Sequence, residues 1–130
     1  MAEYEWIKKI RDNETLLEES YLTFQSERVR IENQICQLST KKNQLLQLLD
    51  SRQDIVRRYL YSHDRDMTEE FQKLKDMFQQ YFNYSDEVYY IERKRLDYEY
   101  EKLEEDYQRT KYKIEEKIAE AYREKKKSGG

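Results

Sequence analysis

The sequence predicts an all-α fold, a long antiparallel two-helix hairpin of the coiled-coil type, on the basis of three observations. The chain of 130 residues has no proline, and its only two glycines are the last two residues, so neither residue type interrupts positions 1–128. Charged residues make up 41% of the chain, and this proportion is typical of long helices. Apolar residues recur at alternating spacings of three and four, the repeat with which helices pack along one stripe. We therefore expect a single domain over residues 1–128.

The first helix is expected over about residues 3–61. Its apolar stripe keeps a seven-residue repeat at Ile7, Ile10, Glu14, Leu17, Tyr21, Phe24, Arg28, Ile31, Ile35, Leu38, Lys42, Leu45, Leu49, Arg52, Val56 and Tyr59. A strict 3.5-residue repeat predicts a left-handed supercoil. The polar members Glu14, Arg28 and Lys42 are 14 residues apart, and polar residues in such a stripe help to fix register and partner choice.

A turn is expected over about residues 62–66, at the middle of the chain, where Ser-His-Asp-Arg-Asp interrupts the periodicity. Asp66 followed by Glu69 fits a capping box in which Asp66 is the N-cap of a second helix. Each helix would then be about 90 Å long at 1.5 Å per residue. The alternative, one continuous helix in a parallel oligomer, stays open because no glycine marks the turn.

The second helix is expected over about residues 67–126, followed by a disordered tail at 127–130. Its apolar stripe begins with Met67, Phe71, Leu74, Phe78, Tyr81, Ser85 and Val88 and resumes with Leu96, Tyr100, Leu103, Tyr107, Thr110 and Ile114. The two runs are out of phase by one residue. Asn83 and its neighbours are poor helix-interior residues, so we expect a kink, a skip or fraying within residues 83–95.

No arrangement of residues predicts catalysis, a cofactor or a metal site, so we expect a protein that is not an enzyme. The single histidine, His63, lies in the predicted turn without convergent partners. Cys36 is expected to be a small buried apolar residue rather than a nucleophile. The net charge of −3 has both signs interspersed, which argues against a nucleic-acid partner. No apolar run approaches the length of a membrane span or a secretion signal, so a cytoplasmic location is expected.

Apolar residues outside the stripe predict a partner surface. Leu22, Val29 and Cys36 repeat every seven residues, and Leu46, Leu48, Ile55 and Leu60 also flank the stripe. Tyr98 and Tyr112 lie 14 residues apart on the opposite side of the second helix, and tyrosine is enriched at interfaces. Because hairpin closure needs only one narrow stripe on each helix, we expect Leu22, Val29, Cys36, Tyr98 and Tyr112 to contact helices of another protein, or of a second copy.

The length, the two-helix form and the Tyr/Phe/Glu/Lys-rich composition resemble those of small helical proteins encoded beside LXG toxins in Gram-positive type VIIb secretion systems, which are related in shape to the WXG superfamily. Patterns of the export-associated type Tyr/Phe-x-x-x-Asp/Glu occur at Phe82…Asp86, Tyr100…Glu104 and Tyr112…Glu116, whereas the Trp-x-Gly turn is missing and the only tryptophan is Trp6. The resemblance implies a targeting chaperone that binds the helical LXG domain of a toxin in the cytosol, with a second small helical protein as a further partner and co-export with the cargo as an alternative fate. A stalk or chaperone of flagellar or type III export and a plain structural coiled coil are the competing interpretations.

Overall fold

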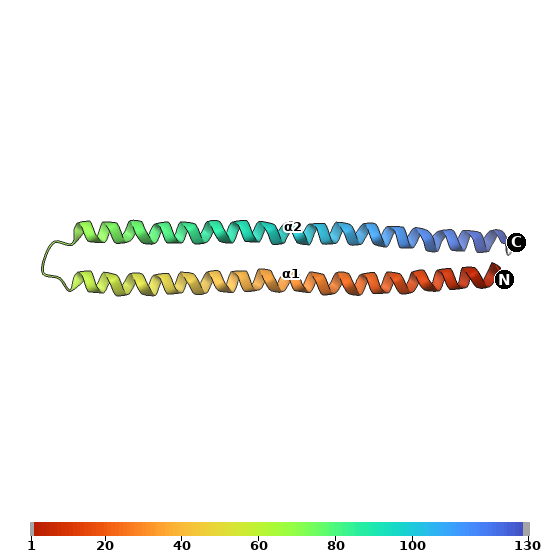
Figure 1. Ribbon diagram of the computed structural model, residues 1–130, viewed down its shortest axis with the longest axis horizontal. Coiled ribbons are helices and arrows are strands. Elements are labelled where there is room, and N and C mark those ends of the chain that lie inside the picture. The colour runs from red at the N-terminus through yellow and green to blue at the C-terminus, as the bar shows by residue number, and fades with distance from the viewer. Residues whose placement is uncertain (1, 129–130) are drawn as a thin grey trace. The chain divides into compact units, whose positions relative to one another are not determined.

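The computed structural model describes residues 2–128, with side chains from 4 to 127, and consists of two long helices joined by a short connection (Figure 1). Helix α1 spans Ala2–Tyr61 (60 residues) and helix α2 spans Thr68–Ser128 (61 residues). The part of the chain that the structure describes contains no strand. The predicted all-α hairpin is therefore confirmed, with helix bounds within two residues of those expected.

The hairpin divides into two compact units. The turn unit comprises residues 33–96, and the terminal unit comprises residues 1–32 and 97–130. In each unit a segment of α1 packs beside a segment of α2 that runs in the opposite direction. Contacts between Lys42 and Asp86 in the turn unit, and between Phe24 and Tyr107 in the terminal unit, fix this pairing.

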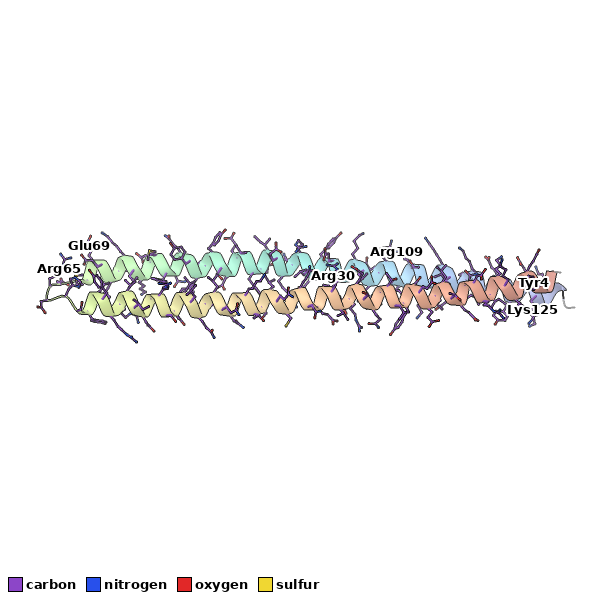
Figure 2. The ribbon with its side chains drawn as sticks, turned by 60° about the horizontal axis from the view of Figure 1, so that its bottom comes forward. Tyr4, Arg30, Arg65, Glu69, Arg109 and Lys125 are labelled. Atoms are coloured by element: carbon purple, nitrogen blue, oxygen red, sulfur yellow. The ribbon has the colours of Figure 1, made fainter. Side chains whose placement is uncertain are left out.

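The turn is closed by hydrogen bonds that need no glycine. The Ser62 N–H donates to the carbonyl oxygens of Arg58 and Tyr59, each at 3.2 Å, and the His63 N–H donates to that of Leu60 at 3.3 Å. No residue that the structure describes has a positive φ. Since glycine is required only where the chain enters that region, the missing glycine does not argue against a hairpin. Arg65 and Glu69 mark this end of the molecule in Figure 2.

The start of α2 differs by one residue from the predicted cap. The Phe71 N–H donates to the Met67 carbonyl at 2.9 Å, so Met67 is the N-cap and Asp66 precedes it. The Asp66 carboxylate accepts the Thr68 N–H at 3.0 Å and also the Thr68 hydroxyl. These two hydrogen bonds, that from the hydroxyl first, lower the pKa of Asp66. Asp66 therefore satisfies a free N–H at the helix start, as expected, but from outside the predicted capping box with Glu69.

Beside the turn, the core of the turn unit is an apolar cluster. Leu60, Met67, Leu74 and Phe78 are buried, and Leu49, Phe71 and Phe82 pack against them. Tyr61 and Phe71 are in contact at the helix ends, with ring centroids 4.8 Å apart. Because this cluster contains residues from both sides of the turn, apolar burial stabilises the reversal of the chain directly.

In the terminal unit the core is sparse and partly aromatic. Its buried apolar residues are Trp6, Ile10, Ile31, Ile114 and Ala121. Between them, Phe24 of α1 and Tyr107 of α2 stack with centroids 4.3 Å apart and planes 12° from parallel. A guanidinium nitrogen of Arg30 in α1, the residue labelled in Figure 2, lies 3.9 Å from a carboxylate oxygen of Glu99 in α2. Thus tyrosine takes the place of leucine in part of the helix contact, as the sequence predicts.

The buried stripe on each helix follows a repeat closer to 3.6 than to 3.5 residues, which corrects the predicted register at both ends of α1. Trp6 and Leu60 are buried, whereas the predicted stripe members Ile7 and Tyr59 are 44% and 64% exposed. A strict heptad drifts by about 20° per repeat on an ideal helix. Over a helix of this length, that drift moves the contact to a neighbouring residue.

The same drift explains why the phase slip predicted in α2 is not present in the structure. The helix continues without interruption through residues 83–95, so the expected fraying is not present. Phe82, Ser85 and Tyr89 continue the buried or half-buried stripe, while the predicted members Tyr81 and Val88 are exposed. The two runs are out of phase only when a 3.5-residue repeat is imposed on them.

At its C-terminal end, α2 extends beyond the predicted bound at residue 126. Lys127 and Ser128 are helical, which corrects the first half of the predicted tail, and residues 129–130 lie outside the described residues. Three lysines occupy the last turn, where cations interact favourably with the negative end of the helix dipole.

Candidate functional site

All five residues predicted to form the partner surface are exposed. The exposed fraction is 59% for Leu22, 47% for Val29, and 65% for both Tyr98 and Tyr112. Cys36 is exposed as well, so its interpretation as a buried residue is wrong. Cys36 follows the half-buried Ile35 by one residue, which places its side chain about 100° around the helix from that of Ile35.

The structure does not bring these residues together into one surface. In the terminal unit, Val29 lies two residues from the buried Ile31 and Tyr112 two residues from the buried Ile114. Two residues correspond to about 200° around a helix, so each side chain lies on the side of its helix that faces away from the other helix. The predicted stripes are therefore two separate outer edges, one on α1 and one on α2.

A more continuous apolar surface lies in the turn unit and begins with a second stripe on α2. Its members are spaced by four and three residues, and they are Met77, Tyr81, Tyr84, Val88 and Ile91. Their exposed fractions range from 41% at Val88 to 68% at Tyr84. This spacing keeps the five side chains on one side of α2, next to the stripe that contacts α1.

Helix α1 carries a matching second stripe. Its members have the same spacing, and they are Lys41, Leu45, Leu48, Arg52 and Ile55. The leucines and the isoleucine are 42–58% exposed. Leu45 lines one open groove of about 190 Å³ together with Tyr84 and Val88 of α2. The two stripes therefore lie on the same side of the turn unit, and we call their ten residues the turn-unit face.

Two cations lie within this face and have no carboxylate partner. Lys41 and Arg52 make no ion pair in the described part of the chain. Of the carboxylates in residues 41–55 and 74–91, Asp50, Asp54, Asp76 and Asp86 lie elsewhere on their helices by the spacing of the helical turn. Glu87 borders the face at its outer edge on α2, because it is three residues from Tyr84 and four from Ile91. The turn-unit face is thus apolar and positively charged, although the chain as a whole carries a net charge of −3.

The neighbouring Lys42 differs from these two cations because it is satisfied within the hairpin. Its Nζ lies 3.2 Å from Asp86 Oδ1 and 4.3 Å from the centre of the Tyr89 ring. Lys42 was predicted as a polar member of the helix contact, and it is half-buried there. One lysine of the Lys41–Lys42 pair therefore stabilises the helix contact, while the other remains available on the surface.

The sequence contained a signal for the turn-unit face. The spacing of Met77, Tyr81, Tyr84, Val88 and Ile91 is itself a heptad pattern, but Tyr81 and Val88 fit the predicted contact stripe and were assigned to it. On α1, Leu48 and Ile55 were recognised as lying beside the contact, and Leu45 was assigned to it. With a repeat of 3.6 residues, the contact stripe and the exposed stripe of each helix are distinct. With a repeat of 3.5 residues, members of the exposed stripe are assigned to the contact.

His63 has a local structural role in the turn. Its Nδ1 lies 2.9 Å from the Tyr59 carbonyl oxygen, and its ring packs edge-on against the Tyr59 ring with centroids 4.8 Å apart. Among the residues that the structure describes, no group of three or more His, Cys, Asp or Glu side chains is placed to hold a metal ion. Within the same residues, neither helix has an apolar stretch long enough to cross a membrane.

Comparison with known proteins adds no relative: no family model matches the chain, and neither the curated proteins nor the solved structures include a significant match.

Proposed function

We propose that this protein is a non-enzymatic adaptor that binds helices of another protein. The observation that carries the proposal is the pair of exposed apolar stripes on one side of the turn unit. Large apolar patches on soluble proteins usually mark interaction sites, and a stripe with four-three spacing is the surface that a further helix packs against. The outer edges at Leu22, Val29 and Cys36 and at Tyr98 and Tyr112 would provide additional contacts in a larger assembly.

The cargo proposed from the family resemblance is the helical LXG domain of a type VIIb toxin, which the adaptor would hold in the cytosol and present for export. A helical domain offers the amphipathic surfaces that the turn-unit face requires. The test is direct: each LXG domain encoded in the source genome is produced, mixed with this protein, and examined by size-exclusion chromatography with light scattering. One domain should form a complex of defined stoichiometry.

A matched pair of variants makes this test specific. Leu48→Glu with Tyr84→Glu places two charges in the turn-unit face and should abolish the complex. Arg57→Glu with Lys75→Glu alters exposed positions of the turn unit outside the face and both outer edges and should leave the complex intact. If no LXG domain binds, the assignment of the cargo is wrong. If a complex forms and survives charges in the face and on both outer edges, the proposed binding surfaces are wrong.

A further inference from the structure

The turn-unit face has the geometry of an incomplete three-helix bundle. Leu45 and Leu48 from α1 and Tyr84 and Val88 from α2 flank the line along which the two helices meet. A third helix laid along that line would contact both stripes at once, with its own apolar residues in the spaces between the side chains of α1 and α2. The groove at Leu45, Tyr84 and Val88 is one such space.

The charges on the face restrict the chemistry of that third helix. A helix that covers the face would remove Lys41 and Arg52 from water, and neither has a carboxylate partner in the described chain. Removing an unpaired cation from water is costly, whereas a facing carboxylate offsets much of that cost. A helix with acidic residues beside its apolar stripe therefore fits the face, and a basic helix of equal hydrophobicity does not.

A second copy of this chain fits the face less well. In a two-fold symmetric pair the same surface patch meets itself. The ten residues of the face include Lys41 and Arg52 but no carboxylate, and Glu87 only borders the face on α2. Pairing two copies would thus bury four cations without a counter-charge from the face.

We propose that the turn-unit face binds one amphipathic helix of another protein, with Glu or Asp residues flanking the helix's apolar stripe. This inference rests on the proposed function and specifies the chemistry of the partner. Electrostatic complementarity of this kind determines which of several amphipathic helices is bound and how fast it associates.

The test uses the full chain and two synthetic helical peptides, each about four heptads long with leucine at the core positions. One peptide carries Glu at the positions beside the leucines, and the other carries Lys there. Binding is measured by fluorescence anisotropy at about 0.15 M salt, where exposed charges far from the site are screened. The acidic peptide should bind at least about tenfold more tightly than the basic one.

Charge reversal is the decisive comparison. Lys41→Glu with Arg52→Glu should invert the preference, so that the basic peptide binds more tightly. Lys102→Glu with Lys113→Glu changes the net charge by the same amount away from the face and should keep the original preference. Circular dichroism of both variants should match that of the parent, because the four residues are exposed.

Three results would overturn the inference: equal affinity for the two peptides, binding of neither peptide, or a preference that charge reversal on the face does not change. A dimer in sedimentation velocity that Tyr84→Glu dissociates would also overturn it, since a second copy would then occupy the face. The proposed function fails separately. If the protein binds an intact helical partner and Leu22→Glu abolishes that binding, the partner binds at the outer edge of α1. In that case the inference about the turn-unit face is wrong, and the proposed adaptor function stands.

Discussion

Truncation of Ile31 to alanine should destabilise the hairpin strongly, whereas the same truncation at Leu22 should not. Ile31 is 2% exposed, and Leu22, nine residues earlier and thus half a turn away on α1, is 59% exposed. A buried Ile→Ala change costs about 2–5 kcal/mol, because it removes apolar contacts and leaves a cavity. A change at an exposed site usually costs less than about 0.5 kcal/mol.

The expected shift in melting temperature follows from the length of the chain. Unfolding entropies of about 2.1 cal/mol/K per residue convert 1 kcal/mol into about 4 °C for 130 residues. Ile31→Ala should therefore lower the melting temperature by about 8–20 °C, and Leu22→Ala by no more than about 2 °C. Thermal melts followed by circular dichroism at 222 nm, at equal protein concentration, provide the measurement.

The comparison also tests whether the outer edge of α1 is free in solution. A loss at Leu22→Ala comparable with that at Ile31→Ala would mean that Leu22 is buried in the protein as it exists in solution, through self-association. It would refute the assignment of Leu22 and Val29 to a surface available to a partner.

Four further predictions concern the turn, the hairpin and the face. Asp66→Asn should speed amide hydrogen exchange at Thr68. Because the folded-state pKa of Asp66 is lowered, the contribution of its carboxylate to the stability of the folded state should be complete above the ordinary pKa of about 3.9. This contribution should be lost as the pH falls through the lowered pKa, which an NMR titration of the carboxyl group would detect. Spin labels near residues 10 and 118, at the exposed Lys9 and Lys117, should be close in one chain, and a separation on the order of 150 Å, as in a continuous helix at 1.5 Å per residue, would exclude the hairpin. Leu48→Glu with Tyr84→Glu should leave the circular-dichroism spectrum of the isolated protein unchanged, whereas Leu74→Glu with Phe78→Glu, at buried positions, should unfold the turn unit; equal effects would make the face part of the core. His63→Ala and Cys36→Ala should each leave partner binding intact, and a loss of biological activity with unchanged binding would reveal chemistry that the sequence does not predict.

The helices and the turn could be predicted from the sequence because they depend on local signals. The missing prolines and glycines, the midpoint break and the acidic residues after Asp66 all act within a few residues of their position. The register of the helix contact was harder to predict, because an error in the repeat accumulates along the helix. A difference of a tenth of a residue per turn is negligible at Ile31, but it moves the contact to a neighbouring residue by Trp6 and Leu60.

The candidate site could be predicted only in part for the same reason. Leu22, Val29, Tyr98 and Tyr112 lie so far from the contact that an error in the repeat does not change their exposure. Tyr81 and Val88 lie next to the contact, so the same error moved them from the surface to the core. The pairing of α1 with α2, which determines that Leu45 meets Tyr84 and Val88 in one groove, required the structure.

The most direct test of the central claim is to co-produce this protein with the proposed helical cargo and to measure, by native mass spectrometry, whether a complex forms and with what stoichiometry. The proposed function predicts a heteromeric complex that Leu48→Glu with Tyr84→Glu dissolves, while the isolated variant remains helical. Two results together would contradict the proposed function. The protein would form no complex with any helical partner, and charges at Leu48, Tyr84, Leu22 and Val29 would change neither its isolated state nor its activity.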